Sequence, residues 1–171
     1  LAIIGIYFFS DGERLATEMQ YLIDNKIKEK GEFQFTTALE NLRRKGARFS
    51  PGRVTEWLDC GNKNVTVQTN QRYLEFIRNK DLISRKAQVK NSFVIEPCFI
   101  DDDVIIENSV VGPFVSIGKH SHISDSRIRN SIIQTNTRIS WAILENSMLG
   151  NFVNFEAKPR DLSVGDYNSI T

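Results

Sequence analysis

The sequence predicts two structural parts, a mixed α/β segment followed by a β-solenoid, and three observations support this prediction. Apolar residues in the first half recur at helical spacing and are flanked by apolar runs of strand length. Aliphatic residues in the second half instead recur every five or six positions, which fits neither a helix nor a simple hairpin. The chain has 171 residues, 40% of them hydrophobic and 25% charged, which is the composition of a folded globular protein.

The first part, residues 1–79, is predicted to hold an incomplete α/β domain with elements in the order β-α-α-β-α. Its first nine residues are almost all apolar and rich in branched and aromatic side chains, which suits a strand covered on both faces. Because two strands are too few for a complete sheet, we expect the missing strands to precede Leu1. The predicted elements are a strand over 1–9, helices ending near Gly31 and Gly46, a strand over 54–59 and a helix over 65–77.

Residues 80–91 are polar and charged and are predicted to connect the first part to a solenoid over residues 92–171. In the solenoid, the aliphatic steps group into units of 16 or 17 residues. Similar tetrapeptides recur at equivalent positions of the repeat: Glu-Asn-Ser-Val at 107–110, Arg-Asn-Ser-Ile at 129–132 and Glu-Asn-Ser-Met at 145–148. This pattern predicts a triangular prism in which each side is one short strand and each corner one turn.

In this prism the aliphatic side chains point inward, and small polar residues such as Asn, Ser and Gly occupy the corners, where left-handed backbone angles occur. Residues 156–161 break the pattern, and residues 162–170 resume it as an expected last coil. The repeat resembles the hexapeptide repeat of left-handed parallel β-helices. An irregular β-sandwich is the alternative fold for this half.

Charge and composition exclude several classes of function. Lys and Arg number 22 and Asp and Glu 21, so the net charge of +1 offers no drive toward nucleic acid or an anionic membrane. No apolar run reaches the roughly 18 residues of a membrane span. The two cysteines, Cys60 and Cys98, are too few for a disulfide framework, which favours a cytoplasmic protein.

The most informative short motif is Trp-Leu-Asp-Cys-Gly at residues 57–61. An Asp at the end of a strand, followed by Gly, places one carboxylate at the edge of the sheet where α/β folds bind ligands. A lone carboxylate beside phosphates is a typical magnesium ligand, and the flat face of Trp57 suits a sugar ring. The alternative is that Asp59 only caps the helix that follows.

Three motifs and the solenoid occur in a characteristic order. Residues 2–9 read Ala-Ile-Ile-Gly-Ile-Tyr-Phe-Phe, residues 31–36 read Gly-Glu-Phe-Gln-Phe-Thr, and the Trp-Leu-Asp-Cys-Gly motif precedes the repeat. This order resembles the back half of the sugar-1-phosphate nucleotidyltransferases, which carry an AGIYxF strand, a GEYQLTD segment, a WxDxG segment and often a hexapeptide β-helix. The resemblance implies a partial Rossmann-like nucleotidyltransferase domain followed by a left-handed parallel β-helix.

The resemblance also implies an activity and a set of site residues. Such an enzyme joins a nucleoside triphosphate to a sugar 1-phosphate with the help of Mg²⁺, releases pyrophosphate, and forms a nucleoside-diphosphate sugar. By this resemblance Asp59 is a metal ligand, and Trp57 and the strand from Ile3 to Tyr7 line the sugar pocket. Lys30 stands where some members place an Arg near the sugar phosphate.

The sequence also departs from the family pattern. The glycine-rich nucleotide loop, the first metal-binding Asp and the Glu-Lys-Pro segment lie upstream of the Gly-Ile-Tyr strand in the family, and Thr37 replaces the Asp that ends its Leu-Thr-Asp motif. We therefore expect these 171 residues to be the truncated C-terminal part of an enzyme and to be inactive alone.

Two other functions are open. The β-helix can serve as a non-catalytic module for assembly or regulation, and outward aromatic residues such as Trp141 favour a homo-oligomer. Hexapeptide acyltransferases use a His as base with coenzyme A along the prism, and His120 and His122 are candidates for that role.

Overall fold

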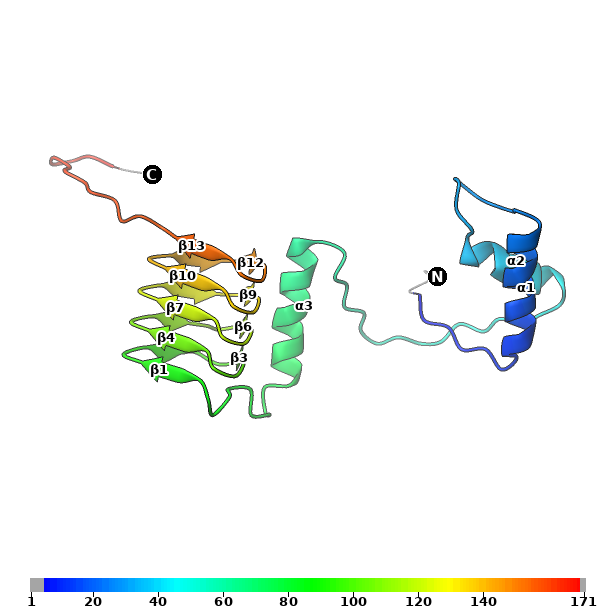
Figure 1. Ribbon diagram of the computed structural model, residues 1–171, viewed down its shortest axis with the longest axis horizontal. Coiled ribbons are helices and arrows are strands. Elements are labelled where there is room, and N and C mark those ends of the chain that lie inside the picture. Colours follow the sequence, from blue (N-terminus) through cyan, green and yellow to red (C-terminus); the bar gives the residue numbers. More distant parts are fainter. Residues whose placement is uncertain (1–4, 170–171) are drawn as a thin grey trace. The chain divides into compact units, whose positions relative to one another are not determined.

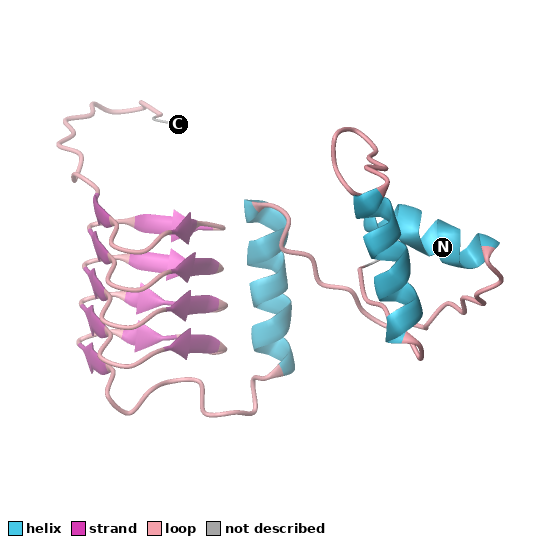
Figure 2. Cartoon of the chain, turned by 45° about the vertical axis from the view of Figure 1, so that its right-hand side comes forward, coloured by secondary structure: helices cyan, strands magenta, loops and turns pink. Residues whose placement is uncertain are grey.

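The computed structural model describes residues 5–169, and the chain divides into two compact units after Thr55 (Figure 1). Figure 2 shows that the first unit contains helices and loops, whereas the second combines one helix with stacked strands. This division by compactness is not the same as the predicted domain boundaries at residues 79 and 91, which stay a prediction. Residues 80–91 already contain strand β1 (Gln88–Lys90).

In the first unit, helices α1 (Gly12–Asp24) and α2 (Phe35–Arg44) pack against each other. The Asp11 side chain caps α1 by accepting a hydrogen bond from the amide of Arg14. Both helices lie on the predicted apolar stretches, but α1 ends at Asp24 and not near Gly31, whereas α2 ends at Arg44, close to the predicted end at Gly46. Their buried apolar residues are Leu22, Ala38, Leu39 and Leu42.

The two predicted strands of the first part do not form within the described residues. Residues 5–9 and 54–59 have no partner strand, and only an isolated bridge between Glu29 and Glu32 occurs in residues 5–62. A strand is stabilised by hydrogen bonds to a neighbour, so an apolar run without a neighbour stays extended. Ile6 and Phe8 consequently expose 80% and 92% of their surface. The expected Rossmann-like domain is therefore not evident in residues 5–169; residues 1–4 lie outside the described part.

The second unit begins with helix α3 (Lys63–Phe76), which the sequence predicted over 65–77. Asn62 caps this helix by accepting hydrogen bonds from the amides of Asn64 and Val65. Figure 1 shows α3 lying along one side of the stacked strands, where it contacts β9 (Ser131–Ile133).

The solenoid predicted from the five-and-six spacing is present as three parallel sheets. One sheet has five strands and the other two have four, so the chain makes about four turns. The first sheet holds β1, β4 (Ile105–Glu107), β7 (His122–Ser124), β10 (Arg138–Ser140) and β13 (Asn154–Glu156). The second holds β2 (Phe93–Val94), β5 (Val110–Val111), β8 (Arg127–Arg129) and β11 (Ile143–Glu145); the third holds β3 (Cys98–Ile100), β6 (Val115–Ile117), β9 and β12 (Met148–Leu149).

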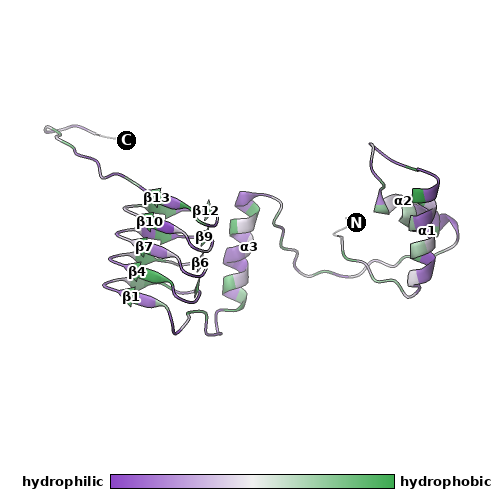
Figure 3. Ribbon diagram, viewed as in Figure 1, coloured by the Kyte–Doolittle hydropathy of each residue, from purple (hydrophilic) through white to green (hydrophobic). Residues whose placement is uncertain are grey.

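The register of these sheets stacks equivalent residues directly on one another. In the first sheet Ile106 pairs with Ile123, and Ile123 pairs with Ile139. All three are at most 1% exposed, so they form a column inside the prism. Figure 3 shows apolar residues recurring in the stacked strands. The inward positions from Ile100 to Ile139 were thus predicted correctly, whereas Phe155, at the end of the stack, is 40% exposed.

Left-handed backbone angles mark the corners of the prism. Asp103, His120, Asn136 and Phe152 share one corner column and have φ values of 56° to 60°. Asn is the commonest of the left-handed residues in the solenoid, as expected from its tolerance of this conformation. Trp141 also takes such a corner position, with φ of 58°.

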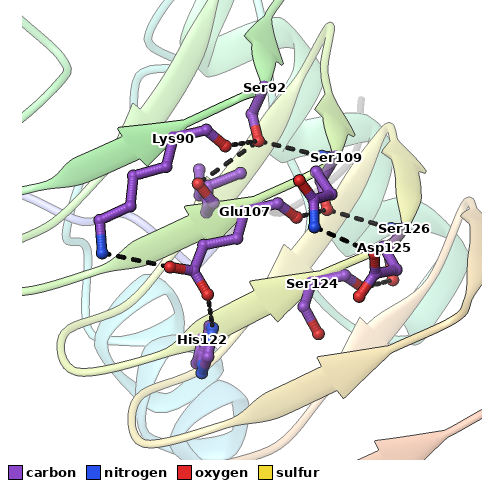
Figure 4. Close-up of polar contacts among 10 residues, drawn as sticks. Lys90, Ser92, Glu107, Ser109, His122, Ser124, Asp125 and Ser126 are labelled. Carbon is purple, nitrogen blue, oxygen red and sulfur yellow. Dashed lines mark hydrogen bonds and ion pairs between the residues drawn. The ribbon is translucent and has the colours of Figure 1, made fainter.

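Buried hydroxyl groups join successive coils at the corners (Figure 4). The Ser92 hydroxyl accepts a hydrogen bond from the amide of Ser109 at 2.9 Å, and the Ser109 hydroxyl accepts one from the amide of Ser126 at 3.0 Å. The next coil repeats the bond between the Ser126 hydroxyl and the amide of Ala142. These bonds satisfy amides that the buried turns would otherwise leave without partners.

The expected last coil over residues 162–170 does not form a strand within its described part, residues 162–169. A turn at Asp166 and Tyr167 does form, and Tyr167 has φ of 60°, like the corner residue Phe152. Ile170 lies outside the described residues. Among residues 5–169, no helix has both the length and the apolar character that crossing a membrane requires.

The inward column makes a direct prediction about stability. Ile123→Ala will lower the free energy of unfolding by about 3 kcal/mol, because it opens a cavity at a fully buried position. Ile143→Ala removes the same atoms from a side chain that is 85% exposed, and it will change stability by less than about 0.5 kcal/mol. Urea denaturation followed by circular dichroism measures both, and equal losses would contradict the inward assignment.

Candidate functional site

The predicted site residues Trp57 and Asp59 lie in the segment that leads into helix α3. The Asp59 carboxylate turns back on its own chain, where Oδ1 accepts hydrogen bonds from the amides of Cys60 at 2.8 Å and Gly61 at 3.1 Å. A Cβ atom at Gly61 would lie 3.2 Å from Asp59 Oδ2, so the glycine leaves room for the carboxylate. Trp57 is 61% exposed and presents its ring to solvent.

Two further contacts connect this segment to the helix. The Thr69 hydroxyl donates a hydrogen bond to the carbonyl oxygen of Asp59 at 2.5 Å. Arg72 Nε lies 2.5 Å from Glu56 Oε1 in an ion pair. Glu56 raises the pKa of Arg72, chiefly by accepting this hydrogen bond. Thr69 therefore holds the backbone at Asp59, and Arg72 holds the side chain of Glu56, on either side of Trp57.

Tyr7 and Lys30 belong to the first unit. The Tyr7 ring packs against Phe9 and edge-on against Phe35, with centroids 6.2 and 5.1 Å apart. Lys30 is exposed, with φ of 52°, in the turn between the bridged residues Glu29 and Glu32. Ile3 lies outside the described residues.

Tyr7 also lines an open cleft of about 690 Å³ within the first unit, together with Ser10, Arg14 and Arg48. Neither Arg14 nor Arg48 was predicted to be a binding residue. Arg14 donates a hydrogen bond to the carbonyl oxygen of Lys45 at 2.6 Å, a long-range contact that no short motif encodes. Two guanidinium groups beside an aromatic ring are suited to bind an anionic ligand.

A metal site in this part of the chain would rest on few ligands. No group of three or more His, Cys, Asp or Glu side chains in residues 5–169 is arranged to hold an ion. Mg²⁺, however, usually takes only one or two protein carboxylates, and substrate phosphates and water complete its shell. Asp59 fits that requirement as a single ligand, because both amide hydrogen bonds use the same oxygen, Oδ1.

The two histidines face different carboxylates on the solenoid. His122 Nε2 lies 3.1 Å from Glu107 Oε2, whereas His120 Nδ1 lies 3.6 Å from Asp103 Oδ2. Lys90 Nζ contacts the other oxygen of Glu107 at 3.1 Å, so Glu107 bridges Lys90 and His122 across successive coils (Figure 4). Lys90 and then His122 lower the pKa of the Glu107 carboxyl by hydrogen bonding to its charged form.

Two curated proteins are similar to at least 90% of the chain. The chain is 28% identical over 175 residues to a glucose-1-phosphate thymidylyltransferase of Streptomyces griseus, which covers 93% of this chain and 48% of the relative. A second glucose-1-phosphate thymidylyltransferase, from Streptomyces antibioticus, is 26% identical over 170 residues, or 90% of this chain and 46% of the relative. The chain is a distant relative of glucose-1-phosphate thymidylyltransferases.

This relationship confirms the predicted resemblance to sugar-1-phosphate nucleotidyltransferases. The chain spans about half the length of the curated relatives it matches. No protein-family model matches the chain.

The Glu107 network predicts a measurable pKa change. Lys90→Gln removes the largest cause of the lowered pKa, so the pKa of Glu107 will rise toward its ordinary value. Because the pKa of Glu107 is lowered in the folded state, the stabilisation by this network is present above the ordinary carboxyl pKa. It is lost as the pH falls through the lowered pKa.

Carbon-detected NMR titration of the glutamate carboxyls measures this change. Lys119→Gln is the matched control, because Lys119 is exposed and does not contact Glu107. An identical Glu107 pKa in both variants would show that the contact with Lys90 does not form in solution.

Proposed function

We propose that the chain is the C-terminal part of a sugar-1-phosphate nucleotidyltransferase. In this proposal residues 1–79 belong to the catalytic domain, residues 80–91 connect the parts, and residues 92–171 form a left-handed β-helix. The similarity to two thymidylyltransferases over at least 90% of the chain is the main support, because it includes the motifs and the solenoid together.

The proposed reaction is a displacement at phosphorus. A phosphate oxygen of the sugar 1-phosphate attacks the α-phosphorus of a nucleoside triphosphate, a new P–O bond forms, and the bond to pyrophosphate breaks. Positioning and charge neutralisation provide most of the catalysis in such a reaction. When bound, Mg²⁺ supplies positive charge to the phosphate oxygens.

The chain's own residues have distinct roles in this proposal. The Asp59 carboxylate holds the metal, and the exposed ring of Trp57 provides an apolar face for the sugar. Tyr7 and Ile3 line the sugar pocket, and the ammonium group of Lys30 binds the sugar phosphate.

The activity test compares the full-length protein that contains this chain with the 171 residues alone. We expect the full-length protein to release pyrophosphate from a nucleoside triphosphate when a sugar 1-phosphate and Mg²⁺ are present. We expect no turnover from the 171 residues alone, because they contain neither the glycine-rich loop nor the first metal-binding Asp of the family. Turnover by the short chain at an ordinary enzymatic rate would contradict the proposal.

Asp59→Asn in the full-length protein provides the sharper test. The change keeps the shape of the side chain but removes its charge, so turnover will fall by about 100-fold or more while folding is preserved. Asp161→Asn makes the same change in an exposed residue beyond the last strand and will leave turnover unaltered. Equal activity of the two variants at saturating Mg²⁺ would contradict the assignment of Asp59 as a metal ligand.

Assembly through the solenoid is a second proposed function, favoured by exposed apolar side chains on the later coils. Trp141, Ile143 and Phe152 expose 54%, 85% and 77% of their surface. A second copy of the chain would cover these residues in a homo-oligomer.

Light scattering of the 171-residue chain tests this assembly. The unaltered chain will be oligomeric at tens of micromolar, and Trp141→Glu will shift it toward the monomer. Tyr73→Glu is the matched control, since Tyr73 on α3 is also 54% exposed. A monomeric unaltered chain would reject assembly through the solenoid.

A further inference from the structure

We propose that helix α3 positions Asp59, and that the third sheet of the solenoid fixes α3 in place. Thr69, Asn70 and Ser116 are the positioning residues in this arrangement. The inference rests on the proposed function, because Asp59 has its metal-binding role only there. It assigns the solenoid a part in the active site in addition to any part in assembly.

One side of α3 holds the segment that carries Asp59. Thr69 and Arg72 are three residues apart on the helix, so their side chains project from the same side. The Thr69 hydroxyl binds the Asp59 carbonyl oxygen, and Arg72 pairs with Glu56. The first contact restrains the backbone after Trp57, the second restrains the side chain of Glu56 before it, and Asn62 caps the helix directly after the motif.

A different side of α3 docks on the solenoid. Lys63, Val67, Asn70 and Leu74 follow the spacing of four, three and four that places residues on one helical stripe. Val67 and Leu74 are 2% and 1% exposed, so the two apolar residues of the stripe are buried, whereas Lys63 at its start is exposed. Lys63 Nζ donates a hydrogen bond to the carbonyl oxygen of Asn146 at 2.9 Å.

Asn70, in the middle of this stripe, makes two hydrogen bonds to the solenoid. The Ser116 hydroxyl donates a hydrogen bond to Asn70 Oδ1 at 2.6 Å. Asn70 Nδ2 in turn donates to the carbonyl oxygen of Phe114 at 3.4 Å. The paired donor and acceptor fix the helix in both rotation and translation relative to strand β6.

Ser116, the residue of β6 that binds Asn70, lies in a rigid part of the solenoid. Ser116 lies between Val115 and Ile117, both of which are 0% exposed and point into the prism. Strand β6 is internal in its sheet, with β3 on one side and β9 on the other. Because α3 is attached to this strand, we expect Asp59 to be as well ordered as the solenoid core and less mobile than a residue in a free loop.

The amides of Cys60 and Gly61 report on the position of Asp59, because both donate to its Oδ1. Hydrogen exchange at these two amides, measured by NMR on the 171-residue chain, tests the proposal without any assay of activity. Thr69→Val and Asn70→Ala will each accelerate their exchange about fivefold, the effect expected from losing one hydrogen bond.

Conservative and control variants separate positioning from general stability. Thr69→Ser keeps the hydroxyl and will restore slow exchange at Cys60 and Gly61. Gln68→Ala alters an exposed neighbour on the same helix and will have no effect. The amides of Ile123 and Ile128 in the solenoid core will exchange at the unaltered rate in every variant.

Either of two results of the exchange experiment overturns the inference. One is unchanged exchange at Cys60 and Gly61 in both Thr69→Val and Asn70→Ala, and the other is acceleration by Gln68→Ala as large as by Asn70→Ala. In the full-length protein, Asn70→Ala will also raise the Mg²⁺ concentration for half-maximal turnover about tenfold, the lower bound for loss of a ligand-orienting contact.

Different results would reject the proposed function and the positioning role of α3. Absence of pyrophosphate release by the unaltered full-length protein rejects the function, whatever the exchange rates show. Normal release with no shift in Mg²⁺ dependence in Asn70→Ala rejects the positioning role alone.

Discussion

The stacking of equivalent side chains from one coil to the next is the interaction on which the rest of the structure depends. Ile106, Ile123 and Ile139 pair in register, and each is almost completely buried. A slip of one residue would turn an entire column outward, so the apolar column and the parallel hydrogen bonds enforce the same register. At the corners, the hydroxyls of Ser92, Ser109 and Ser126 each accept a hydrogen bond from an amide of the next coil, and these bonds form only in the same register.

A regular prism of this kind also provides a surface on which other elements can be placed accurately. Helix α3 uses that surface, with Val67 and Leu74 buried and Asn70 bonded to Ser116 on an internal strand. The same helix bonds to the Asp59 backbone through Thr69. The segment that contains the candidate metal ligand is therefore continuous with the solenoid in packing as well as in sequence, and it belongs to the second compact unit.

The solenoid could be predicted from sequence because its signal is periodic. Each coil buries its aliphatic residues against the next, so the spacing of apolar residues directly reflects the geometry. Helices α1, α2 and α3 could be predicted for the same reason. The conformation of residues 5–9 and 54–59 could not, because a strand depends on hydrogen bonds to partners that apolar character alone does not specify.

The candidate site was accessible to sequence analysis only in part. The Trp-Leu-Asp-Cys-Gly motif is local, and its position before a helix could be predicted. The bond of Thr69 to Asp59 and that of Ser116 to Asn70 join residues ten and forty-six positions apart, and neither pair forms a short motif. Arg14 and Arg48 come together in the cleft beside Tyr7 for a similar reason, since it is the packing of the first unit that sets their separation.

A crystal structure of the full-length protein with Mg²⁺, a sugar 1-phosphate and a non-hydrolysable nucleoside triphosphate would test the central claim most directly. We expect an Asp59 oxygen about 2.1 Å from the metal, with the bond between Asn70 and Ser116 retained. A metal held by other residues, with the Asp59 carboxylate bonded only to the amides of Cys60 and Gly61, would contradict it.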